Sequence, residues 1–174
     1  MRIFAVTASI LAAGAAVIAP GARALEVVSS VAAVEPASLD PALEAYRKGD
    51  YDTARRLAEP LVAVDDPDAQ LLMAQLMERG LGGPKDATAA RTLYVKSAMA
   101  GHPFAQYALG ELAFHGNGVQ QNYTRAAGWY AKAAEAGHTL AKVRLGYLYS
   151  EGLGVPKEPG RALELFESAA NAGE

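Results

Sequence analysis

The chain has no cysteine, and only one of its 174 residues is a tryptophan. Without thiols it can form neither a disulfide nor a thiolate metal site. Lysine and arginine together number 16 against 19 aspartates and glutamates, so the basic surface that favours nucleic-acid binding is missing. No serine lies in a nucleophile elbow, and no His-Glu-x-x-His motif occurs. We therefore expect no catalytic, metal or cofactor site.

Three histidines are present, and two of them, His102 and His138, occupy the same position 36 residues apart. A zinc site needs three or four converging ligands, so a structural role in a turn is the better interpretation. The Asp65-Asp66 pair and Asn122 precede helical patterns, where their side chains are expected to cap the helix N-terminus.

A 36-residue pattern occurs three times, beginning at Ala69, Ala105 and Ala141. In each copy a second helical block follows 21 residues after that alanine, at Ala90, Ala126 and Ala162. A fixed period of this length is typical of a solenoid, in which each repeat buries its apolar face against its neighbours. The first helices are expected near 68–79, 104–115 and 140–151, and the second near 87–100, 123–136 and 160–172.

Small and apolar residues follow the helical period in each second helix. This spacing predicts a packing stripe rather than a ligand groove, with the members Ala90, Leu93, Tyr94, Ser97 and Ala98; Ala126, Trp129, Tyr130, Ala133 and Ala134; Ala162, Leu165, Phe166, Ala169 and Ala170. In the first helices, Ala74, Gly110 and Gly146 are expected to let the second helix of the same repeat cross closely. Glycine pairs end the first helices, where positive φ is needed.

The N-terminus predicts secretion. Arg2 precedes an uncharged, mostly apolar run, and Ala22-Arg23-Ala24 fits a cleavage site, so residues 1–24 are interpreted as a cleaved bacterial signal peptide. A retained membrane anchor is the alternative. Cleavage would change the net charge from −3 to −5, which disfavours nucleic acid and anionic membranes as partners. We expect the mature protein to be periplasmic or secreted.

Residues 25–39 are interpreted as a flexible leader, and residues 40–64 as an N-terminal helical cap that resembles a partial repeat. In this cap, Ala45 and Tyr46 are expected to face Tyr51, Ala54 and Leu57. Residues 65–174 then contain the three repeats, at about 67–102, 103–138 and 139–174.

These residues resemble the Sel-1-like repeat family, a relative of the tetratricopeptide repeat. The second repeat carries Leu109-Gly110, Gly116-x-Gly118-Val119, Trp129-Tyr130 and Gly137-His138 at the family's positions, and the third carries Leu145-Gly146, Tyr149 and Gly152-x-Gly154-Val155. The first repeat departs from the pattern, with Met73-Ala74 in place of Leu-Gly. The resemblance implies an all-α, right-handed α-α superhelical solenoid and a scaffold that serves many pathways.

The resemblance also implies that the first helices line a concave face. Side chains that leave the packing stripe there are predicted to bind a protein or peptide partner: Leu71, Gln75, Arg79, Tyr107, Glu111, Phe114, His115, Val143, Tyr147, Ser150 and Glu151. Packing between repeats is the alternative role for several of them. A non-enzymatic adaptor is therefore the predicted function, with cell-wall glycan binding through tyrosines and Trp129, or hydrolysis, as alternatives.

The stripe of the last helix raises a separate expectation. No further helix follows to cover Ala162, Leu165 and Phe166, whereas terminal repeats usually carry a polar cap. We expect either weak self-association or a partner docked on this helix.

Overall fold

The computed structural model describes residues 38–173, so the signal peptide and all but the last two residues of the predicted leader lie outside the described part of the chain. All regular structure in residues 38–173 is helical. The helices are α1 (Asp40–Arg47), α2 (Tyr51–Ala63), α3 (Pro67–Arg79), α4 (Ala87–Met99), α5 (Pro103–His115), α6 (Tyr123–Glu135), α7 (Thr139–Glu151) and α8 (Pro159–Gly173).

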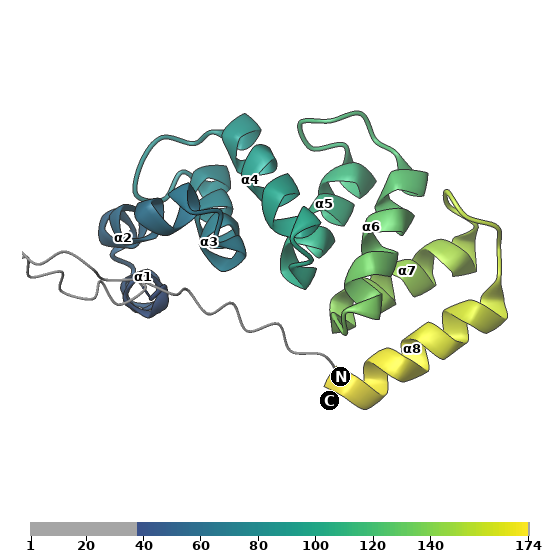
Figure 1. Cartoon of the computed structure of the whole chain (residues 1–174). Helices are drawn as coiled ribbons and strands as arrows, with labels where there is room; N and C mark the ends of the chain where they lie inside the picture. The colour runs from purple at the N-terminus through teal and green to yellow at the C-terminus, as the bar shows by residue number, and fades with distance from the viewer. Residues whose placement is uncertain (1–37, 174) are drawn as a thin grey trace, which may run out of the picture. The chain divides into compact units, whose positions relative to one another are not determined.

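Each helix packs against the helix before it and the helix after it, as Figure 1 shows. Packing is most extensive within the pairs α3–α4, α5–α6 and α7–α8, and these pairs stack through α4–α5 and α6–α7. The pair α1–α2 joins the stack through α2 and α3. The predicted helical solenoid and its 36-residue repeat are confirmed.

The capping prediction is confirmed for Asn122 and for one member of the Asp65-Asp66 pair, Asp66, whereas Asp65 accepts hydrogen bonds from the side chains of Gln70 and Lys96 instead. Asp66 Oδ1 accepts a hydrogen bond from the backbone N–H of Ala69 at 2.8 Å, and Asn122 Oδ1 accepts one from Arg125 at the same distance. His102 and His138 take the N-cap position of α5 and α7, where their Nδ1 atoms accept backbone N–H groups at 3.2 Å. The repeated histidines therefore have the structural role that their spacing indicated.

Glycine in the left-handed conformation ends each first helix, at Gly80 (φ 70°), Gly116 (φ 74°) and Gly152 (φ 71°). Within α5, a Cβ on Gly110 would overlap the ring of Tyr130 on α6. Within α7, a Cβ on Gly146 would lie 2.8 Å from the ring of Phe166 on α8. Both contacts join the two helices of one repeat, as predicted.

Alanine supplies much of the core, and most of the predicted stripe is buried in α4 and α6, where Tyr94, Ala98, Tyr130 and Ala134 are members of the core clusters and Leu93 and Trp129 are half-buried. One expectation was wrong. Leu57 is exposed, because Ala58 and Leu61 provide the inward face of α2 instead. In α8, Ala162 and Ala169 are buried, whereas Phe166, which was expected to lack a covering helix, is exposed, as is Ala170.

Candidate partner-binding surface

The first helices of the repeats, α3, α5 and α7, place equivalent residues side by side because their N-caps and their C-terminal glycines recur 36 residues apart. We call the outward face of these three helices the helix-A surface. Four rows of side chains cross it from repeat to repeat: Asp68, Phe104 and Leu140; Leu71, Tyr107 and Val143; Gln75, Glu111 and Tyr147; Arg79, His115 and Glu151.

Exposed apolar side chains gather on this surface in the second and third repeats. Phe104 and Leu140 are both 57% exposed, Tyr147 is 43% exposed and Val143 is 40% exposed. Phe104 and Leu140 line two adjoining hollows of about 360 and 330 Å³. We call these four residues the apolar patch. Large apolar side chains grouped in this way on a surface are typical of an interaction site.

The sequence prediction included Val143 and Tyr147 but missed Phe104 and Leu140. Both lie three residues before a predicted member, Tyr107 or Val143, and therefore on the same face of the helix. The helical period therefore could have predicted that both residues lie on this face. They were missed because they lie in the first turn, at the predicted ends of their helices.

A cluster of rings supports the patch from below. The ring of Tyr107 stacks on His138 with centroids 4.7 Å apart, and Phe104 meets the same imidazole edge-on at 4.6 Å. Tyr107 also lies 5.8 Å from the buried ring of Tyr130. Burial lowers the pKa of His138, so the neutral imidazole is favoured in this cluster. Tyr107 therefore packs on Tyr130 of its own repeat and on His138, the N-cap residue of α7, rather than lying free in the predicted groove.

Glu111 joins the second repeat to the third. Its carboxylate accepts the hydroxyl of Tyr130 at 2.6 Å, and it accepts Nε and Nη2 of Arg144 at 2.9 and 3.2 Å. His115 Nε2 lies 3.6 Å from it. Burial and the hydrogen bond to Glu111 raise the pKa of Tyr130, so the phenol stays protonated. These contacts give Glu111 a structural role in joining two repeats, in addition to any part in the predicted partner binding.

Two other predicted residues also contact neighbouring side chains or backbone. Phe114 is half-buried, with its ring 5.3 Å from Tyr123 and 6.2 Å from Tyr147. Ser150 is half-buried and donates its hydroxyl to the carbonyl of Tyr147. By contrast, His115 and Glu151 are exposed on the helix-A surface.

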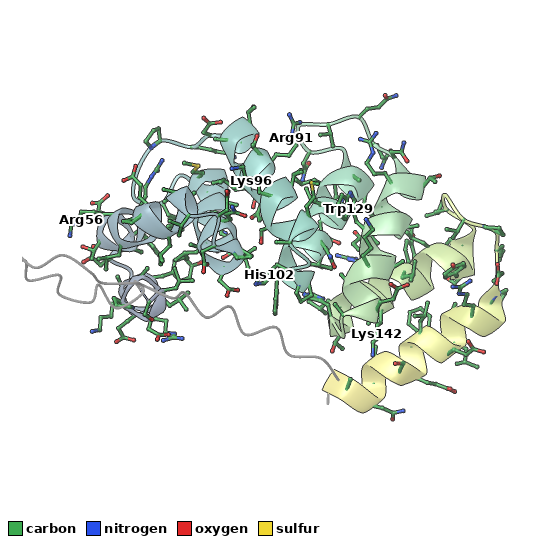
Figure 2. All side chains as sticks on the ribbon, viewed as in Figure 1. Arg56, Arg91, Lys96, His102, Trp129 and Lys142 are labelled. Atoms are coloured by element: carbon green, nitrogen blue, oxygen red, sulfur yellow. The ribbon has the colours of Figure 1, made fainter. Side chains whose placement is uncertain are left out.

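Two of the three predicted residues of the first repeat lie at a third hollow. Leu71 and Gln75 line a pocket of about 710 Å³ between α1 and α3, whereas Arg79 reaches the hydroxyl of Tyr46 at 3.4 Å. Gln75 also lines the hollow that contains Phe104, so the pocket and the apolar patch adjoin along the helix-A surface. Figure 2 shows His102 near the start of α5. Its ring contacts Asp68 of the pocket at 2.7 Å and lies 5.9 Å from the ring of Phe104 in the apolar patch.

Trp129 lies on α6, the second helix of its repeat (Figure 2). It is half-buried and packs against the core cluster that contains Tyr94 and Leu109, and the ammonium of Lys132 lies 4.6 Å from its ring centre. The ring is therefore partly covered by protein and has a cation near it, which leaves little of it for stacking on a sugar.

Within residues 38–173, no three histidine, aspartate or glutamate side chains come together as a metal site would require. The same residues contain no helix with the length and apolar character needed to span a bilayer. What the described residues do offer is an apolar patch beside the pocket between α1 and α3, on a stack of helices.

The fold and this surface define an α-helical repeat protein, and comparison with known proteins identifies the type of repeat. The model of the Sel1 repeat matches residues 67–102, 103–138 and 139–174. The chain belongs to the Sel1 repeat family, whose members are generally scaffolds for protein interactions.

Solved structures agree with this assignment. A Sel1 repeat protein from Oxalobacter formigenes is 35% identical, with a TM-score of 0.75 over 79% of this chain and 56% of that one. A protective antigen of uropathogenic Escherichia coli with an SLR fold is 32% identical, with a TM-score of 0.67 over 69% of this chain and 26% of the antigen. Helicobacter pylori cysteine rich protein B shares the fold at 21% identity, with a TM-score of 0.50 over 78% of this chain and 91% of that one.

The chain therefore spans about half of the Oxalobacter protein and about a quarter of the Escherichia antigen. No curated protein matches it.

Proposed function

We propose that the protein is a non-enzymatic adaptor that binds a protein or peptide partner through the helix-A surface, with the apolar patch as the main contact. The observation that carries this proposal is the grouping of Phe104, Leu140, Val143 and Tyr147, all 40% or more exposed, on two adjacent first helices. Apolar and aromatic anchors of this kind contribute most of the binding free energy in protein interfaces.

The rigidity of the support favours the same function. The patch lies on helices fixed by capping residues and by the Glu111–Arg144 ion pair between repeats. A surface that is already ordered loses little conformational entropy when a partner binds. The apolar sequence of residues 3–19 and the Ala22-Arg23-Ala24 site support the further proposal that this adaptor acts in the periplasm or outside the cell.

Affinity capture with a matched pair of variants tests the proposal. The baits are the wild-type protein, the Phe104→Ala/Leu140→Ala variant, and a control that truncates two more exposed apolar residues, Val64 (74%) and Met99 (78%). Neither control residue lies on a first helix. We expect a partner to be retained by the wild type and the control and lost with Phe104→Ala/Leu140→Ala, while thermal melting shows all three folded. Equal recovery by all baits would contradict the proposed surface.

Glycan binding is the second candidate, and exposed Tyr147 is the residue that favours it. Pull-down on insoluble peptidoglycan separates the two functions. Retention on the glycan that disappears with Tyr147→Ala would support this second candidate over the first.

A further inference from the structure

The pocket between α1 and α3 has a composition different from that of the apolar patch. Its volume is about 710 Å³, and its apolar walls come from Leu39, Leu43 and Tyr46 on one side and from Leu71 and Leu72 on the other. Three carboxylates, those of Asp40, Asp66 and Asp68, stand among these walls, and no lysine or arginine lines the pocket.

Each carboxylate uses one oxygen within the described residues. Asp66 Oδ1 accepts the N–H of Ala69, Asp68 Oδ1 contacts His102 Nε2 at 2.7 Å, and Asp40 Oδ2 accepts the hydroxyl of Ser38 at 2.8 Å. The second oxygen of each group can accept a further hydrogen bond. The Asp68 side chain is largely exposed, so it is open to a ligand. Arg79 does not line the pocket, but its guanidinium donates a hydrogen bond to the hydroxyl of Tyr46, which does.

We propose that this pocket binds a lysine or arginine side chain of the partner segment that also contacts the apolar patch. Such side chains lay their aliphatic stems on apolar surface and keep the charged head at a polar rim, which matches leucine walls with aspartates among them. Hydrogen bonds between ammonium or guanidinium groups and carboxylates are stronger than hydrogen bonds between neutral groups. The inference rests on the proposed function, because it names the chemistry of the same partner.

The two regions are close enough for one segment to use both. Gln75 lines the α1–α3 pocket and also the hollow that contains Phe104 and Leu140. A segment that follows the helix-A surface therefore meets the carboxylates at α1 and α3 and the apolar patch at α5 and α7. The recognised motif is a basic residue near apolar ones.

Charge argues against the chain's own leader as the occupant. Residues 25–37 contain Glu26 and Glu35 and no lysine or arginine, so their charge has the same sign as that of the pocket. Anionic ligands are disfavoured for the same reason. A basic partner gains attraction from the three aspartates and also from the negative net charge of the protein.

Selection from a displayed peptide library tests the inference. The baits are the wild-type protein, Asp40→Asn/Asp68→Asn, Asp40→Asn alone, and Phe104→Ala/Leu140→Ala. Asparagine keeps the shape of aspartate and removes its charge, and the single change at exposed Asp40 serves if the double variant is poorly folded. Peptides selected by the wild type are then synthesised in pairs, with the basic residue retained or replaced by norleucine.

We expect selected peptides to carry lysine or arginine near apolar residues, and norleucine to weaken binding by about tenfold. That difference should shrink with Asp40→Asn and disappear with Asp40→Asn/Asp68→Asn. Peptides without a basic residue that still depend on Phe104 and Leu140 would overturn the pocket inference and leave the proposed function standing. A norleucine effect that persists in the asparagine variants would also overturn it. If no peptide is enriched by any bait, both the pocket and the peptide-binding function fail.

Discussion

Replacing Gly110 with alanine should destabilise the protein although alanine is the better helix former. Gly110 lies inside α5, and an added Cβ would overlap the ring of Tyr130. That ring cannot swing aside, because Tyr130 is fully buried and its hydroxyl is bonded to Glu111 at 2.6 Å. Either α5 moves away from α6, or the bond to Glu111 is lost.

Two opposing terms set the size of the effect. Overpacking of this kind costs about 1–3 kcal/mol, whereas replacing glycine with alanine inside a helix contributes about 1 kcal/mol of stability. The net loss in the free energy of unfolding for Gly110→Ala should therefore reach up to about 2 kcal/mol. Gly146→Ala should lose less, because the ring it meets, Phe166, is exposed and can move.

Gly128 provides a matched control. It lies inside the neighbouring helix α6, is exposed, and has nothing within 4 Å of an added Cβ. Gly128→Ala should therefore stabilise the protein by up to about 1 kcal/mol. Urea unfolding of both variants measures the difference, which isolates the overlap with Tyr130 because the helix-propensity term is common to both. If Gly110→Ala is as stable as Gly128→Ala, the close crossing of α5 and α6 is refuted.

Three further predictions follow from the same contacts. Tyr107→Ala should lower the free energy of unfolding by about 2 kcal/mol, because this ring packs on His138 and Tyr130. Tyr147→Ala should weaken partner binding and leave the free energy of unfolding in urea unchanged. Equal stability of the two variants would contradict this division of roles. Burial lowers the pKa of His138 below its ordinary value of 6.5, so the unfolded chain takes up this proton at higher pH than the folded one. The free energy of unfolding should be at its full value above pH 6.5 and fall as the pH drops towards the lowered pKa. In His138→Asn, which keeps a capping side chain, this part of the pH dependence should flatten. An unchanged slope of stability against pH in that variant would contradict the assignment of this dependence to His138. Asn122→Ala should lose about 1 kcal/mol, measured by thermal melting against Asn117→Ala in the same loop, where no capping bond is lost.

The repeat made the fold predictable from sequence. Helix ends agree within two residues, because capping residues and terminal glycines occur in every copy and act locally. The role of Gly110 and Gly146 was also predictable, because glycine or alanine recurs at this position inside each first helix, where a second helix was expected to cross closely.

The surface was less predictable, because its side chains make contacts over long sequence distances. Periodicity placed Tyr107 and Tyr147 on one face of their helices but could not show that His138, at the N-cap of α7, covers Tyr107. It could not pair Glu111 with Arg144, which lies 33 residues away. Leu57 was misplaced because Ala58, one position further on, is the residue that faces the core.

The most direct test of the account is photo-crosslinking from the apolar patch. Benzoylphenylalanine is placed at Leu140 in one protein and at Met99 in another, and each is irradiated in an envelope extract of the source organism. Both positions are exposed, but only Leu140 lies on the helix-A surface. We predict a discrete protein adduct from position 140 and none from position 99. No adduct from position 140, or the same adducts from both positions, would contradict the claim that the helix-A surface binds a partner.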